Sequence, residues 1–267
     1  MRSTAGLALT LRFGPIQGLG GKALYFQIEG GVMMRLYSSE KFNPEELALL
    51  GRGIGTVAQG TIVVGRDGRA ISRYGKRALV VGIVSTGSTI MDVRLIPLIA
   101  LRDFAKKKNY PFAYVYYYNG VNVEINGIDA EEVKTIVEKR TFVEASPNDI
   151  GATVYYPNAL DDIVHEILRH YDFNLGTKVL VDCMNTPAVL LFPRMSEKFG
   201  MEVDMINDMM TSYLPPKPKE IFLQKLQKGD YDFGLRFRPD GIVEFHRDED
   251  VKEFDSLWNL MDFLSSL

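Results

Sequence analysis

Hydrophobic and polar positions follow two spacings that succeed each other along the chain. Short runs rich in β-branched and aromatic residues, such as 61–65, are followed by segments in which apolar residues recur every three or four positions, such as 72–87. The first spacing is typical of strands and the second of amphipathic helices. Their regular succession predicts an α/β fold, with two domains built on mixed, mostly parallel sheets flanked by helices.

Three strand-like runs precede this succession, at 7–13, 23–29 and 32–38, and glycine-rich turns separate them. A helix is expected next, over 43–59. Asn43 is a good N-cap residue, and Pro44 after it suits the first helical position. We therefore expect a first domain over residues 1–145 that carries extra strands at its N-terminal end.

The segment 141–158 is the best candidate for a domain boundary, because it has two prolines, several turn formers and little helical periodicity. A second series of strand and helix patterns follows, which predicts a second α/β domain over 146–267. Within it, the pattern predicts one helix over 186–200 and a closing helix over 253–267.

The closing helix is apolar around much of its circumference. The ordinary core stripe is broadened by further apolar residues, and together these are Phe254, Leu257, Trp258, Leu260, Met261, Phe263, Leu264 and Leu267. Such a helix packs on two sides. Either its own domain covers both sides, or one side meets another molecule. We expect a homo-oligomer or a protein partner, with a two-fold pair as the simplest assembly.

Composition excludes several classes of function. The net charge of -3 gives no basic footprint for nucleic acid, and no apolar run is long enough for a membrane span. The first residues do not resemble a signal peptide, so a cytoplasmic location is expected. The one cysteine, Cys183, lies in an apolar run and is predicted to be a buried structural thiol.

The stretch Val63–Leu79 carries the clearest candidate chemistry. A predicted strand ends in Gly-Arg-Asp, turns through Gly68, and leads through Arg69 and Ser72 into a predicted helix. Arginines at a strand end beside a helix N-terminus suit a phosphate or another anion. Arg66, Arg69 and Ser72 are therefore the candidate anion-binding residues. The alternative is an ion pair between Arg66 and Asp67 that only stabilises the turn.

Three glycines in Gly51–Thr56 resemble part of a dinucleotide-binding motif, but the motif requires a turn between a strand and a helix. Here the glycines lie inside the predicted helix 43–59. We therefore predict that they allow close packing against another helix.

The order of motifs is similar to that of the α-D-phosphohexomutases, the phosphoglucomutase/phosphomannomutase family. NPEELALLGRGIGT, VVGRDGRAIS and ALVVGIVSTGSTIMDVRLIPLIAL follow the family's order and spacing over residues 43–101. Further on, KVLVDCMNTPA, LPPKPKE and DYDFGLRF resemble motifs of the family's second domain. The resemblance implies the family's first two domains, and a phosphosugar or phosphate anion as ligand.

Two family motifs are altered in this chain. The family's active-site loop, TASHNP, aligns with Val115–Gly120, which places Tyr117 at the position of the phosphoryl-carrying serine. The chain has no serine or threonine between Pro111 and Gly127. A serine hydroxyl is short and lies close to a metal, whereas a tyrosine hydroxyl projects further and does not overlay it. No catalytic residue is therefore assigned.

The family's metal loop, DGDADR, aligns with Arg238–Val243. Asp240 is the single remaining aspartate there, and Arg238 replaces another. Because Mg²⁺ requires several oxygen ligands, we expect no metal and no other cofactor at this loop.

Three hypotheses about function follow. The first is a phosphohexomutase-like protein without mutase activity that acts as a binding or interaction protein. The second is a component of a hetero-complex, or a divergent enzyme, that acts on phosphosugars as an intramolecular phosphotransferase. The third is an unrelated activity on the same scaffold, because a fold alone does not determine function.

Overall fold

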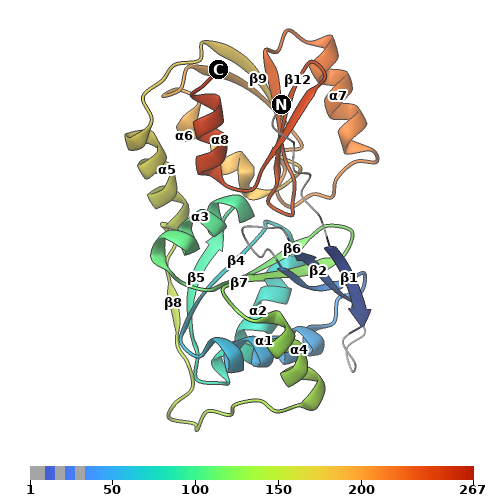
Figure 1. The fold of residues 1–267 in the computed structure, drawn as a ribbon, viewed down its shortest axis with the longest axis vertical. Helices are drawn as coiled ribbons and strands as arrows, with labels where there is room; N and C mark the ends of the chain where they lie inside the picture. The colour runs from blue at the N-terminus through green and yellow to red at the C-terminus, as the bar shows by residue number, and fades with distance from the viewer. Residues whose placement is uncertain (1–9, 16–21, 28–33) are drawn as a thin grey trace, which may run out of the picture. The chain divides into compact units, whose positions relative to one another are not determined.

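The computed structural model describes residues 10–15, 22–27 and 34–267, shown as a coloured ribbon in Figure 1. The chain forms two compact units. The first consists of the described part of Met1–Val64 together with Ile71–Asp92 and Tyr110–Tyr155. The second consists of Gly65–Ala70, Val93–Asn109 and Tyr156–Leu267. Each unit has its own sheet and its own helices, which confirms the predicted α/β class.

The larger sheet has eight strands in the order β1-β2-β3-β7-β6-β4-β5-β8. Its strands are β1 (Thr10–Pro15), β2 (Lys22–Gln27), β3 (Met34–Ser39), β4 (Thr61–Arg66), β5 (Thr89–Leu95), β6 (Phe112–Tyr117), β7 (Val121–Asn126) and β8 (Thr153–Tyr155). Strands β1, β2, β3, β7 and β6 pair antiparallel with their neighbours in that order, whereas β8 pairs parallel with β5. The sheet is therefore mixed. The parts of the predicted N-terminal strands at 7–9, 28–29 and 32–33 lie outside the described residues.

The helices described in the first unit are α1 (Pro44–Ala58), α2 (Ala70–Val84) and α4 (Ala130–Lys139). Capping side chains mark the starts of α1 and α4. The Asn43 carboxamide oxygen accepts hydrogen bonds from the amides of Glu45 and Glu46, and Asp129 caps α4 in the same way. The side chain thus satisfies amides that a helix start leaves unpaired.

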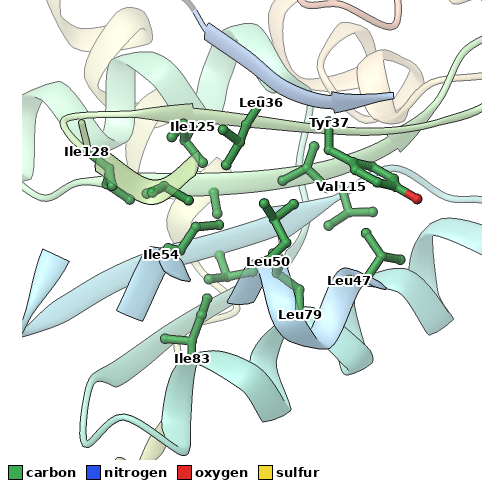
Figure 2. Close-up of a cluster of buried hydrophobic side chains, with 14 of the residues drawn as sticks. Leu36, Tyr37, Leu47, Leu50, Ile54, Leu79, Ile83, Val115, Ile125 and Ile128 are labelled. Carbon is green, nitrogen blue, oxygen red and sulfur yellow. The ribbon is translucent and has the colours of Figure 1, made fainter. Parts of the chain in front are cut away.

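The core of the first unit lies between this sheet and its helices. Figure 2 shows side chains from the strands, including Leu36, Val115 and Ile125, meeting Leu50 and Ile54 of α1. These five side chains are fully buried. Burying such residues is the main favourable contribution to folding.

Glycines allow α1 and α2 to touch backbone to backbone. A Cβ added at Gly51 of α1 would lie 2.1 Å from the Leu79 carbonyl oxygen of α2. A Cβ added at Gly82 of α2 would lie 2.0 Å from the Ala48 carbonyl oxygen of α1. The prediction that the glycines of Gly51–Thr56 serve close helix packing is confirmed.

The second unit contains a five-stranded sheet in the order β10-β9-β11-β12-β13. Its strands are β9 (Thr177–Asp182), β10 (Met201–Ile206), β11 (Phe233–Phe237), β12 (Val243–Arg247) and β13 (Asp250–Phe254). The pairings of β9 with β10 and β11 are parallel, and those of β12 with β11 and β13 are antiparallel. This sheet is also mixed.

Helices cover both faces of the smaller sheet. They are α5 (Ala159–His170), α6 (Phe192–Met195), α7 (Pro218–Lys228) and α8 (Leu257–Leu264). Phe222 of α7 packs on His246 of β12, while Phe263 of α8 packs on the neighbouring Phe245. Successive residues of a strand point to opposite faces, so α7 and α8 lie on opposite sides.

Helix α3 (Leu98–Lys108) belongs to the second unit although its sequence lies among strands of the larger sheet. Its Asp103 carboxylate accepts hydrogen bonds from the Ser256 hydroxyl at 2.8 Å and the Leu257 amide at 2.7 Å, at the start of α8. Burial raises the pKa of Asp103 to about 6, and these two hydrogen bonds oppose the rise. Asp103 therefore ties α3 to α8.

The predicted helix over 186–200 is wrong in extent. A 3-10 turn, η1 (Pro187–Leu190), is followed by the four-residue α6. Pro193 explains the break, because its ring conflicts with a helical carbonyl four residues earlier and it has no amide to donate. The closing helix is also shorter than predicted, because residues Asp250–Phe254 form β13.

Part of the broad apolar stripe of the closing helix packs against other residues of the second unit. Leu260 is buried, and Phe263 contacts both Phe245 and Phe254. Packing within its own domain accounts for Leu260 and Phe263, whereas Leu267 of the same stripe is half exposed.

Cys183, which follows β9, is buried as predicted. Burial, together with nearby aspartates, raises the pKa of its thiol to about 12, so the thiol stays protonated.

Among the helices of the described ranges, none is both long enough and apolar enough to cross a bilayer.

Candidate functional site

The segment aligned with the family's active-site loop is a tight hairpin between β6 and β7. Tyr117 pairs with Val121, and the Tyr118 amide donates to the Gly120 carbonyl at 2.9 Å. Asn119 and Gly120 have φ values of 53° and 136°, in the left-handed half of backbone space. Asn-Gly suits such positions, and the predicted turn is confirmed.

Two contacts hold this hairpin closed from within. The Asn122 carboxamide nitrogen donates to the carbonyls of Tyr118 and Gly120, at 3.0 and 2.9 Å. A Cβ at Gly120 would lie 2.6 Å from the Ser39 carbonyl oxygen of β3. Tyr117 itself is half-buried. The segment is therefore a short turn fixed by its own backbone, and its side-chain hydroxyls belong to tyrosines.

The predicted anion-binding residues lie along the connection from β4 to α2. Arg69 forms an ion pair with Asp67 at 2.9 Å, and both side chains are almost completely buried. Arg69 also donates to the Met184 carbonyl, and Arg66 donates to the Asp67 carbonyl at 2.7 Å. The structure thus brings Arg66 and Arg69 together around Asp67.

Gly68 makes this turn possible. A Cβ there would lie 2.5 Å from Cβ of Met210 and 2.7 Å from its carbonyl oxygen.

Ser72, in the first turn of α2, is fully buried, and its hydroxyl has no hydrogen-bond partner within the described part of the chain. A buried orphan hydroxyl is unusual and requires an explanation.

The loop aligned with the family's metal site follows β11. Arg238 binds both carboxylate oxygens of Asp240, at 3.1 and 2.6 Å, and Arg102 binds the carbonyls of Asp240 and Gly241, each at 2.8 Å. Among the described residues, no group of three or more histidine, cysteine or acidic side chains is arranged to hold a metal ion. The oxygen donors of this loop do not fit Mg²⁺, which prefers several free oxygen ligands.

A buried row of charged side chains crosses the smaller sheet. Arg236 of β11 lies between Asp182 of β9, at 3.2 Å, and Glu244 of β12, also at 3.2 Å. His246 contacts Glu244 at 3.1 Å, and Lys219 of α7 approaches Glu244 at 3.6 Å. Strand register places Asp182, Arg236 and Glu244 directly beside one another. Sequence reasoning did not find this row.

Burial and charge act in opposite directions on its two acids. Burial is the larger effect at Asp182 and raises its pKa, although Asn207, the Met184 amide and Arg236 all oppose it. Burial would also raise the pKa of Glu244, but the hydrogen bond with His246 and the charges of Arg236 and Lys219 lower it to about 2. The difference is consistent with the larger number of positive partners around Glu244.

Comparison with known proteins identifies relatives of this chain. The family model described as phosphoglucomutase/phosphomannomutase, alpha/beta/alpha domain I, matches residues 27–134. A phosphoglucosamine mutase from Methanocaldococcus jannaschii is 26% identical over 221 residues, which is 76% of this chain and 48% of the relative. A phosphopentomutase from Thermococcus kodakarensis is 28% identical over 238 residues, 84% of this chain and 52% of the relative.

A crystal structure of a phosphoglucomutase/phosphomannomutase family protein from Burkholderia thailandensis shares the fold. Its TM-score is 0.66 at 18% identity, and the match covers 83% of this chain and 54% of that one. The α/β fold, the motif order and these relatives point to the same protein family. The chain belongs to the phosphoglucomutase/phosphomannomutase family, the α-D-phosphohexomutases. It spans about half the length of the curated relatives it matches.

Proposed function

We propose that this chain is a phosphohexomutase-like protein that carries out no mutase chemistry of its own and acts by binding a ligand or a protein partner. The observation that supports this most directly is the hairpin Val115–Gly120. It contains no serine or threonine, and its turn is closed by Asn122 and by the approach of Gly120 to Ser39. Phosphoryl relay needs a short, activated nucleophile, which this segment does not offer.

The loop after β11 supports the same proposal. In a phosphoryl transfer, cations stabilise charge that develops on the transferred group. Here Arg238 is already paired with the Asp240 carboxylate and Arg102 with the loop carbonyls. Both guanidinium groups therefore already bind groups of the protein, and neither is placed to stabilise charge on a transferred phosphoryl group at this loop.

The chain is expected not to interconvert hexose 1- and 6-phosphates. The assay supplies both sugar phosphates in turn, with Mg²⁺ and a sugar bisphosphate as activator, and the expected rate equals that of the buffer blank. Intact-mass measurement after incubation with the bisphosphate checks separately for a phosphoryl group on the protein. Turnover that disappears in Tyr117→Phe would show that the tyrosine replaces serine and would contradict the proposal. Activity that appears only with a co-purifying chain would favour the shared-activity hypothesis.

The ligand that we propose is a phosphate-bearing anion at Arg66, Arg69 and Ser72. The buried, unpartnered Ser72 hydroxyl supports this position, because a ligand oxygen would satisfy it. Removing the hydroxyl is expected to leave the fold intact, since it makes no bond to the described chain. Ser72→Ala is expected to weaken phosphate binding by roughly 3- to 10-fold, the usual worth of one hydrogen bond.

Isothermal titration of inorganic phosphate into wild type, Ser72→Ala and Arg66→Ala measures this effect. Arg77→Ala is the matched control for charge, because Arg77 is an exposed arginine further along α2 that packs on the Tyr74 ring. Equal affinity in wild type and Ser72→Ala, or equal losses in Arg66→Ala and Arg77→Ala, would place the anion elsewhere.

A further inference from the structure

Three carboxylates from different parts of the second unit converge on the guanidinium of Arg238. Its Nε and Nη2 bind the two oxygens of Asp240, in the loop after β11. Its Nη1 lies 3.1 Å from Glu253 Oε1 of β13 and 3.5 Å from Glu244 Oε1 of β12. Burial opposes the charge on Arg238, but Asp240, Glu253 and Glu244 outweigh it and raise its pKa. The guanidinium therefore remains charged at the centre of the acidic groups.

A second arginine holds the opposite side of the same loop. Arg102 of α3 is almost fully buried, and it donates from Nη1 to the Gly241 carbonyl and from Nη2 to the Asp240 carbonyl. Gly241 has a φ of 74°, and a Cβ there would lie 2.8 Å from Arg102 Nη1. Only glycine allows both this backbone conformation and the close approach of the guanidinium.

The two arginines occupy the oxygens that a metal ion would need. Both carboxylate oxygens of Asp240 and the carbonyls of Asp240 and Gly241 already accept hydrogen bonds from guanidinium groups. A divalent cation at this loop would also be repelled by Arg238. Bidentate pairing between arginine and a carboxylate fixes geometry as well as charge.

We propose that Arg238 and Arg102 are the built-in cations of the loop Arg238–Gly241, and that they order it and neutralise its carboxylates without a divalent metal ion. Arg238 neutralises the acidic side chains, and Arg102 fixes the backbone. This role is independent of whether the chain turns over a phosphosugar, so it can fail or succeed separately from the proposed function.

Thermal unfolding of the full chain tests this role. Wild type is measured in EDTA, in millimolar MnCl₂ and in NaCl of matched ionic strength, and the midpoints in MnCl₂ and NaCl are expected to be equal. Arg238→Ser leaves three carboxylates facing one another, so its midpoint is expected to fall by roughly 5–10 °C. Arg238→Ser/Asp240→Asn is expected to recover part of this loss, because one unpaired carboxylate is removed.

Arg247→Ser is the matched control, because Arg247 is an exposed arginine at the end of β12 outside this cluster. Equal losses in Arg238→Ser and Arg247→Ser would overturn the proposal. If Arg238→Ser does not fold, Mn²⁺ titration of wild type, followed by electron paramagnetic resonance, decides the matter. No saturable binding is expected. One saturable Mn²⁺ that disappears in Asp240→Asn would show that the loop is a metal site after all.

Discussion

Replacing Gly82 by alanine is expected to destabilise the first unit by about 3 kcal/mol, at the upper end of what overpacking costs. The new methyl group would lie 2.0 Å from the Ala48 carbonyl oxygen and 2.8 Å from the Arg52 amide nitrogen. Both atoms belong to the backbone of α1, so no side-chain rotation relieves the clash and the two helices must move apart. Urea denaturation followed by circular dichroism measures the loss.

Gly75→Ala is the matched control on the same helix. Its Cβ would meet side-chain atoms and no backbone among its nearest neighbours: Val115 at 3.1 Å, Leu47 at 3.3 Å and Phe42 at 3.8 Å, which can shift slightly. Both substitutions gain the same helix propensity, up to about 1 kcal/mol. Gly75→Ala is therefore expected to be neutral or mildly stabilising. Similar stabilities for the two variants would mean that the close approach of α1 and α2 is not tight in solution.

Replacing Arg236 by methionine is expected to destabilise the second unit by about 3–5 kcal/mol, the usual cost of removing one partner of a buried ion pair. Arg236 separates Asp182 from Glu244, and all three side chains are almost completely buried. Methionine fills a similar length but leaves the two carboxylates without their shared cation. Adding Glu244→Gln to this variant is expected to restore part of the stability, and Arg247→Met is the exposed control.

The pH dependence gives this prediction a second readout. In wild type the pKa of Glu244 is lowered to about 2. Its contribution to stability is therefore complete above the pKa of the unfolded chain, about 4.3, and is lost as the pH falls toward 2. In Arg236→Met the two buried carboxylates lose the cation that they share, so they bind protons more tightly in the folded state than they do in wild type, and acidification costs the variant less stability than it costs wild type. The difference between wild type and Arg236→Met should therefore shrink on acidification. A difference that stays constant from pH 7 to pH 4 would contradict this account.

Those elements whose ends are marked by local chemistry could be predicted from the sequence. Asn43 followed by Pro44 locates the start of α1, and Asn119-Gly120 locates the turn between β6 and β7. Strands β8 and β13 could not be found, because β8 is short and exposed and β13 consists largely of charged residues. Their pairing partners on the sheets define them, and a local pattern contains no information about such partners.

The candidate site was predictable only in part. The motif around Arg66 and Arg69 indicated a charged turn, but the sequence did not show that Arg69 and Asp67 form its buried ion pair. Arg236 and Glu244 lie in strands where a charged residue normally indicates a solvent face. Because helices cover both faces of the smaller sheet, these charges are instead buried against one another.

The interleaving of the two units restricts how a gene of this kind can be recombined. Helix α3 is encoded between β5 and β6, yet it supplies Arg102 to the loop after β11 and Asp103 to the start of α8. A breakpoint at 145/146 would transfer the smaller sheet without α3. The Gly241 carbonyl and the Leu257 amide at the start of α8 would then lose their partners, and an apolar helix face would be left uncovered. Chimeras between family members should therefore tolerate exchange only when residues 65–70, 93–109 and 156–267 come from the same parent.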